Sequence, residues 1–306
     1  MKFYNAKILV NNAKNNGYAV PALNTNGGSY DIARAALEAA QELNSPLILQ
    51  VYEPNCEYRG FDYYINLVEF LCKELEITVP VAVQLDHGKS FASVVKAMKA
   101  GFSSVMFDAS NYHLDKNIEE TREVVKVASV LGVSVEAEVG YVKGNEPKKE
   151  ALIGRISVPV LPSILPAKTK IDEALRFVKE VDIDMLAVSV GTTHGVYEKQ
   201  EEIDFKLLEK LRDSISIPLV QHGTCGISLD DISRLAQGGM AKVNFGEPFR
   251  FNYIKYFSEL TDTMEHLWHP WRIMQECKNR LKQDMKKIIH ALGSEGKASN
   301  IINGRK

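Results

Sequence analysis

The chain has 306 residues, enough for one large α/β domain or two medium ones. Its 45% hydrophobic and 25% charged residues are ordinary for a soluble globular protein. The 37 Lys and Arg against 39 Asp and Glu give a formal net charge of −2, which argues against bulk electrostatic attraction to nucleic acid. No apolar run approaches the roughly 20 residues of a membrane span. We therefore expect neither a nucleic-acid nor a membrane partner.

The amino-terminal segment is polar and lacks the features of a signal peptide. Residues 1–16 are expected to form an amphipathic helix, with Ile8, Leu9 and Val10 among Asn and Lys residues. The cysteines show no CxxC pairing and are interpreted as reduced thiols; they are Cys56, Cys72, Cys225 and Cys277. These features predict a cytoplasmic protein.

Eight short apolar runs recur along the chain, rich in β-branched residues and separated by helical patterns. Such near-continuous runs are typical of strands buried on both faces, as in parallel sheets. They cover residues 19–25, 46–51, 80–86, 104–108, 134–139, 185–190, 218–222 and 241–245. Several intervening helical patterns begin at a Ser, Asp or Asn and end at Gly. Eight β-α units in about 250 residues predict a TIM (β/α)8 barrel.

A doubly wound open sheet is the structural alternative. It would need a crossing point and would not bring all eight strand ends to one pocket. After the eighth run the chain continues as helices. We therefore expect a single barrel domain over residues 1–306, including a C-terminal helical extension at about 249–306.

Three histidines, His87, His194 and His222, each lie just past a predicted strand and are each followed by Gly. A lone histidine in such a place is more often structural, but three at one barrel rim, with Glu138 nearby, favour a zinc site. Asp86 precedes His87, and adjacent strand residues point to opposite faces. Asp86 is therefore either a helix cap or, if the chain turns there, a proton-carrying carboxylate beside the metal.

The segment 141–170 contains Gly, Pro and Lys and shows little periodicity. At about 30 residues it is long for a connection between a strand and a helix. It follows Glu138 directly, so we interpret at least its first part as a mobile active-site loop.

Several motifs together are similar to those of the class II, metal-dependent fructose-bisphosphate and tagatose-bisphosphate aldolase family. The most specific are LDHG at 85–88, AGFSSVMFDAS at 100–110 and SVEAE at 134–138. The resemblance runs over nearly the whole chain, from GYAVPALN at 17–24 to GSEGKA at 293–298. It implies a cytoplasmic, homodimeric or homotetrameric lyase of carbohydrate metabolism that carries one catalytic Zn²⁺ per subunit.

The resemblance also implies roles for individual residues. Asp86 matches the group that carries the proton of the C4 hydroxyl, and Glu146 lies where the family has a loop glutamate that moves the proton at C3. His87, His194 and His222 match zinc ligands, and Glu138 matches a carboxylate of an alternative metal position. Gly195 and Gly223 match backbone contacts to phosphate and to a monovalent cation, K⁺ or Na⁺. Polar groups lining the substrate pocket are matched by Asn24, Gln50 and Asn244.

The departures from the family cluster where substrate is bound. Cys225 replaces a hydroxyl residue in HGTCG, and Glu247 stands where a Thr is usual. Tyr52 replaces a small Ser, and Lys278 is the nearest candidate for a tail Arg that reaches a second phosphate across a subunit interface. Either backbone amides still hold the phosphate, or the substrate is a different ketose.

Three functions therefore stay open. The first is reversible cleavage of a ketose 1-phosphate or 1,6-bisphosphate to dihydroxyacetone phosphate and an aldehyde. The second is a class II aldolase for a modified ketose, such as a 6-sulfo-sugar phosphate or a non-phosphorylated ketose. The third is a non-catalytic barrel subunit of an aldolase complex, against which the retained Asp86 and Glu146 argue.

Overall fold

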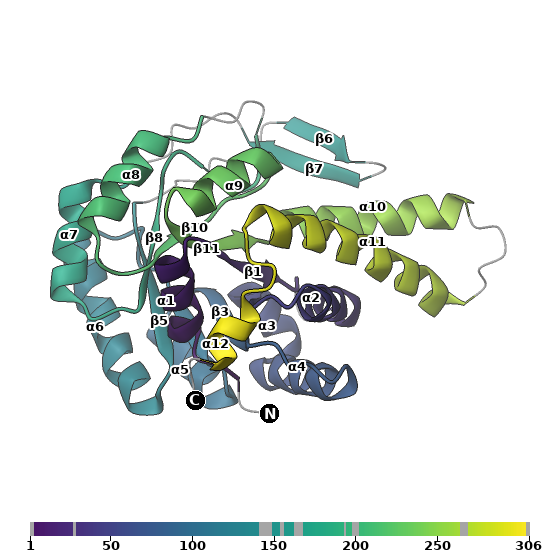
Figure 1. Cartoon of the computed structure of the whole chain (residues 1–306), viewed down its shortest axis with the longest axis horizontal. Coiled ribbons are helices and arrows are strands. Elements are labelled where there is room, and N and C mark those ends of the chain that lie inside the picture. Colours follow the sequence, from purple (N-terminus) through teal and green to yellow (C-terminus); the bar gives the residue numbers. More distant parts are fainter. Residues whose placement is uncertain are drawn as a thin grey trace.

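Eight parallel strands close into a barrel in the computed structural model (Figure 1). Their order around the barrel is β1-β11-β10-β8-β5-β4-β3-β2. The strands are β1 (Val20–Asn24), β2 (Leu47–Tyr52), β3 (Val81–Gly88), β4 (Ser104–Phe107), β5 (Ser134–Val139), β8 (Met185–Val188), β10 (Leu219–Gln221) and β11 (Met240–Phe245). The structure describes residues 3–26, 29–140, 149–153, 156–161, 168–192, 194–197, 202–263 and 269–303. Each predicted run corresponds to one barrel strand, so the predicted TIM barrel is confirmed.

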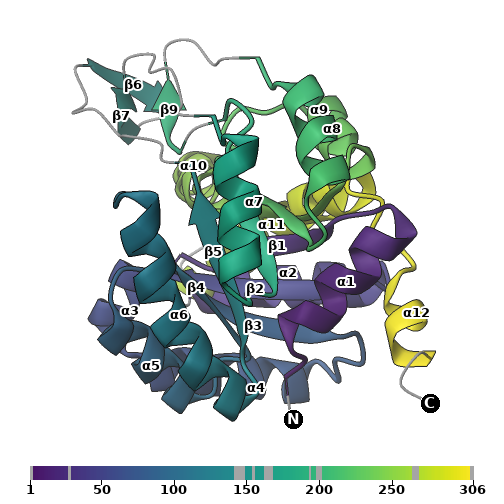
Figure 2. The ribbon, with the colours of Figure 1, turned by 90° about the vertical axis from the view of Figure 1, so that its left-hand side faces the viewer.

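Helices surround the barrel and connect its strands (Figures 1 and 2). They are α1 (Ala6–Asn16), α2 (Tyr30–Glu42), α3 (Glu53–Arg59), α4 (Phe61–Glu74), α5 (Phe91–Ala100), α6 (Leu114–Leu131), α7 (Ile171–Glu180), α8 (Phe205–Ser214), α9 (Leu229–Gln237), α10 (Glu247–Thr263), α11 (Pro270–Ala291) and α12 (Ala298–Asn303). The apolar face of each barrel helix packs on the outward-facing strand residues. Ala33, Ala36 and Leu37 of α2, for example, join Leu47 and Leu49 of β2 in the main hydrophobic core.

Helix α1 closes the amino-terminal end of the barrel. Asn5 caps it by accepting a hydrogen bond from the Lys7 N–H at 2.9 Å, and it ends at Gly17 with φ 64°. Its buried Leu9 and Val10 pack with the inward-facing Ile48 and other residues of the strands in a second hydrophobic cluster. This apolar plug seals one end, so polar chemistry is confined to the opposite rim.

Part of the segment 141–170 differs from the expected loop. Strands β6 (Lys149–Ile153) and β7 (Ile156–Leu161) pair antiparallel, and β7 also pairs with β9 (Val196–Tyr197). The run ISVPVL has the β-branched content of a strand, and this local pattern favours a hairpin over an open loop. The small sheet lies on the side of the molecule opposite the two termini (Figure 2). The first part of the segment, including Glu146, is outside the described residues.

The predicted C-terminal helical extension is present. Helices α10 and α11 run side by side and project beyond the barrel (Figure 1), while α11 also packs along α2. The four cysteines are free thiols and all are buried. Within the described part of the chain, no helix combines the length and apolar character needed to span a membrane.

Replacing Leu9 with Ala should lower the free energy of unfolding by about 2–5 kcal/mol, because it opens a cavity in the plug. The matched control is Ile8→Ala on the exposed face of the same helix, which should change stability by less than about 1 kcal/mol. Chemical denaturation followed by circular dichroism measures both. Equal losses in the two variants would contradict the proposed role of α1.

Candidate active site

A β-bulge at the end of β3 turns two consecutive side chains toward the barrel mouth. The pairing with β4 shifts between Leu85 and Gly88, and His87 has a φ of +51°. This backbone lets both Asp86 and His87 line one cavity, which a regular strand would prevent. Gly88 is required because a Cβ there would lie 2.8 Å from the Met106 carbonyl oxygen. Asp86 is therefore a cavity residue rather than a helix cap.

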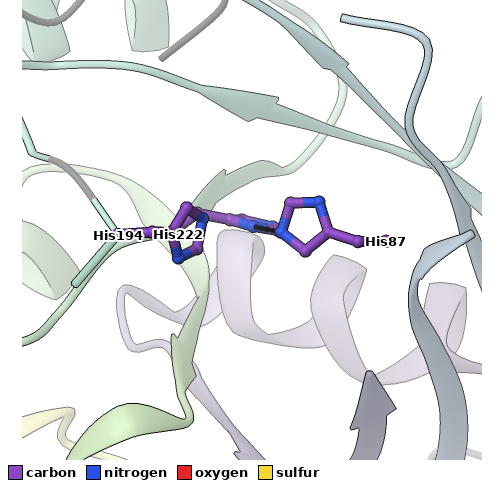
Figure 3. A group of neighbouring side chains, drawn as sticks. All are labelled: His87, His194 and His222. Atoms are coloured by element: carbon purple, nitrogen blue, oxygen red, sulfur yellow. Dashed lines mark hydrogen bonds between the residues drawn. The ribbon is translucent and has the colours of Figure 1, made fainter. Parts of the chain in front are cut away.

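The three predicted histidines converge at this mouth (Figure 3). One ring nitrogen from each of His87, His194 and His222 lies within 4.8 Å of the other two. The ring centroids of His87 and His222 are 4.9 Å apart, and those of His87 and His194 are 5.2 Å apart. His222 is buried, whereas His194 stands at the rim with 43% of its side chain exposed.

Asp108 orients His87 from behind. Its Oδ2 lies 2.8 Å from His87 Nδ1, and its Oδ1 accepts a 2.6 Å hydrogen bond from the Ser110 hydroxyl. The Lys89 ammonium forms an ion pair with the same carboxylate. Burial alone would raise the pKa of Asp108, but His87 and Lys89 together hold it far below its usual range. Asp108 is thus a permanently ionised carboxylate that accepts a hydrogen bond from the Nδ1–H of His87.

Glu136 orients His222 from inside the barrel, as Asp108 orients His87. Its Oε1 lies 2.7 Å from His222 Nε2, and its Oε2 forms a 2.6 Å ion pair with Lys242, in which both side chains are fully buried. Gln84 donates a further 2.7 Å hydrogen bond to Oε2. The pKa of the Glu136 carboxyl, which burial would raise, is instead well below normal because of Lys242 and His222.

These two contacts fix the tautomers that a metal site needs. With Nδ1 of His87 on Asp108 and Nε2 of His222 on Glu136, the other two ring nitrogens face each other at 3.1 Å. Carboxylates behind ligating imidazoles are the usual arrangement at zinc centres. The donor set of three imidazoles with one open side fits a catalytic zinc ion.

Glu138 contributes a further carboxylate to the site. Together with His87 and Asp108 it forms another group able to hold a metal ion. Its buried Oε2 has no hydrogen-bond partner among the described residues. Burial and the neighbouring Asp108 charge raise the pKa of Glu138 to about 7. A nearby cation would satisfy this group, which agrees with its expected place at an alternative metal position.

Two amides hold the carboxylate of Asp86. The side-chain nitrogen of Asn24 donates to Oδ2 at 3.1 Å, and that of Asn244 donates to Oδ1 at 3.4 Å. Gln50 lies alongside with both amide atoms buried and without partners among the described residues. Unpaired buried amides of this kind are suited to hydroxyl groups of a ligand.

One cavity of about 350 Å³ collects most of the predicted site. Its lining includes Asn24, Gln50, Tyr52, Asp86, His87, Glu138, His194, Gly223, Asn244 and Glu247. The rings of Tyr52 and His87 are nearly perpendicular, at 85°, with their centroids 6.1 Å apart. Gly195 follows His194 in the chain and has a φ of +104°.

Two predicted substrate residues lie elsewhere in the described structure. Cys225 is buried and is not part of the cavity lining, and burial together with Glu247 raises the pKa of its thiol to about 11. Lys278 lies on α11 with its ammonium 2.7 Å from Glu38 of its own chain. Neither side chain therefore meets the cavity that holds the histidines.

Sequence reasoning missed the supporting residues Glu136, Lys242 and Gln84. The signal was present, because each lies two residues before a predicted site residue on the same strand and hence on the same face. A charged residue inside an otherwise apolar strand indicates a buried partner. Lys89 and Arg250, which also line the cavity, follow the ends of β3 and β11 and carry no comparable signal.

An eight-stranded barrel with its polar groups at the carboxyl ends of the strands defines an enzyme of the (β/α)8 class. The sequence profile described as fructose-bisphosphate aldolase class-II matches residues 4–297. The chain belongs to this family. It is therefore an aldolase, a carbon–carbon lyase of sugar metabolism, in a family whose reaction splits a ketose bisphosphate into dihydroxyacetone phosphate and an aldehyde and is generally zinc-dependent. The alternative of a non-catalytic barrel subunit is set aside.

Individual relatives cover the whole length. The fructose-bisphosphate aldolase of Staphylococcus epidermidis is 36% identical over 299 residues, which is 97% of this chain and 100% of the relative. That of Geobacillus stearothermophilus is 36% identical over 300 residues, covering 98% and 100%. The crystal structure of the YdjI aldolase from Escherichia coli K12 superposes with a TM-score of 0.81 at 28% identity, covering 97% and 100%.

Zinc binding to protein stripped of metal should release about one proton per site at pH 7.5. Burial opposes charging of His87, but the carboxylates of Asp86 and Asp108 outweigh it and raise its pKa to about 9. The metal must therefore displace a proton below that pH, so the zinc affinity should rise with pH and level off above about 9. Calorimetry in two buffers of different ionisation enthalpy counts the protons. No release at pH 7.5 would show that His87 is already neutral.

Proposed function

We propose that this aldolase holds one zinc ion per subunit on His87, His194 and His222 and cleaves a phosphorylated ketose to dihydroxyacetone phosphate and an aldehyde. The observation that carries the proposal is the convergence of three ring nitrogens within 4.8 Å, two of them from His87 and His194, which line the cavity that contains Asp86. When bound, zinc would act as a Lewis acid for the negative charge that develops on the substrate.

Asp86 is the group that we assign to the proton of the C4 hydroxyl. The amides of Asn24 and Asn244 fix where its carboxylate points, and its place beside His87 puts it next to the metal site. A carboxylate held in this way accepts the hydroxyl proton as the C3–C4 bond breaks, and the C4 carbon leaves as an aldehyde. Glu146 is proposed to carry the proton to C3.

Other parts of the site complete the proposal. Gly195 and Gly223 both have positive φ, which turns their peptide groups away from regular strand geometry and suits contacts to a phosphate and to a monovalent cation, K⁺ or Na⁺. Glu138 is proposed to take the metal in an alternative position. We further propose a cytoplasmic homodimer or homotetramer, which sedimentation equilibrium tests directly.

Replacing Asp86 with Ala should retain zinc and lower kcat by about 10²–10⁴-fold, as expected for loss of a general acid–base group. Zinc content by atomic absorption and aldehyde release by a coupled assay measure the two effects separately. The matched control is Asp62→Ala on α4, which should leave both values unchanged. Normal cleavage by the Asp86 variant would refute the role assigned to this carboxylate.

A ketose with only one phosphate is a second candidate substrate. The observation that favours it is the Lys278–Glu38 ion pair, with the two side chains only 10% and 14% exposed. A lysine committed in this way is a poor ligand for a phosphate at the far end of the substrate. Tyr52 and Asn55 line the cavity, and neither side chain is a cation that could pair with a phosphate. A 6-sulfo-sugar phosphate or a non-phosphorylated ketose belongs to the same set of alternatives.

The ratio of kcat/KM values separates these substrates. A ketose 1-phosphate should be cleaved at least as efficiently as fructose 1,6-bisphosphate, because Lys278 is paired with Glu38 and is not available to the second phosphate. Lys278→Met should leave this ratio unchanged within about twofold, which is within ~0.4 kcal/mol. The one-phosphate alternative would be contradicted if the unmodified protein preferred the bisphosphate with kcat/KM of ~10⁴ M⁻¹s⁻¹ or more and the Lys278 variant lost this preference.

A further inference from the structure

We propose that Glu247 is a positioning residue for His194 and supplies the third of three carboxylates that stand behind the three histidines. The inference rests on the proposed metal-dependent function. It gives a role to a residue that the sequence marks as a departure from the family.

The geometry shows a repeated arrangement. Asp108 lies 2.8 Å from Nδ1 of His87, and Glu136 lies 2.7 Å from Nε2 of His222. The Oε1 atom of Glu247 lies 3.7 Å from Nδ1 of His194, an ion-pair distance rather than a hydrogen bond. Shortening the contact by roughly 0.8 Å would make a third charge-assisted hydrogen bond.

The backbone places Glu247 for this purpose. It is the first residue of α10, one residue past the end of β11, and its carboxylate benefits from the positive end of the helix. Its side chain is 22% exposed and lines the cavity. Among the described side chains, His194 is its only ion-pair partner within 4.0 Å. The carboxylate therefore faces a histidine, whereas the family resemblance places this position where substrate is bound.

A carboxylate on Nδ1 has a definite effect on His194. It holds the proton on Nδ1, so the lone pair of Nε2 is available for the metal, and it makes the imidazole a stronger donor. The side chain of His194 is 43% exposed, against 12% for His87 and 8% for His222, so it is the least enclosed of the three. An added carboxylate therefore restricts the orientation of this ring more than that of the other two.

The test measures metal affinity rather than turnover. Zinc dissociation constants are determined by competition with a chromophoric chelator for the whole protein and for Glu247→Gln and Glu247→Thr. Both variants should bind zinc ~10–100-fold more weakly, the range known for loss of a carboxylate behind a metal ligand. Glu259→Gln on the same helix is the matched control and should bind zinc normally. Glu247→Asp, which keeps the charge on a shorter chain, should fall between the variants and the unmodified protein.

Two further readouts keep the outcomes distinct. Cobalt-substituted protein should show an altered visible spectrum in the Glu247 variants, and metal-free variants with unchanged melting temperatures establish that the fold is intact. Normal zinc affinity in both variants, even with a changed KM for phosphorylated substrates, overturns the inference alone. An unmodified protein that binds no zinc overturns the proposed function, and the inference with it.

Discussion

The mouth of the barrel carries more negative charge than its own lysines can balance. Five carboxylates meet there or just below it, against three cations, Lys89, Lys242 and Arg250; the two lysines are already paired, Lys89 with Asp108 and Lys242 with Glu136. The remaining carboxylates are Asp86, Glu138 and Glu247. Buried charge without a partner is unfavourable, so this arrangement requires protons on the histidines or a metal cation among them. The raised pKa values of His87 and Glu138 express the same requirement.

The polar side chains inside the barrel form two layers, because residues two apart on a strand point to the same face. We call them the lower level and the upper level. Gln84, Glu136 and Lys242 form a lower level that is buried and internally paired. Two residues further along the same strands, the upper level faces the cavity; it consists of Asp86, Glu138 and Asn244. The lower level holds His222 through Glu136 and lies beneath the residues that line the cavity. Because both levels lie on the same paired strands, the strand backbone fixes the position of each level relative to the other.

Much of this could be predicted from sequence, for identifiable reasons. The barrel followed from eight apolar runs, and the histidine cluster followed from their strand ends. The residue pattern alone left open whether Asp86 and His87 share a cavity, because this depends on a bulge and a positive φ that the pattern does not encode. The hairpin of β6 and β7 was hidden by a Pro within its strand. The position of Lys278 depends on the packing of α11 along α2, a long-range contact that local sequence does not specify.

The departures from the family lie at positions outside the two-level network, where a single substitution does not leave a buried charge unpaired. A change at Glu136 or Lys242 would strand a fully buried charge, which typically costs about 3–5 kcal/mol, so these positions cannot change one at a time. Glu247 and Tyr52 lie at the rim, where solvent reaches them and no such constraint acts. In the described structure the carboxylate at position 247 faces a histidine of the candidate metal site, 3.7 Å from its Nδ1. Under the role proposed for Glu247, substrate choice and metal affinity would be coupled through the same rim residues.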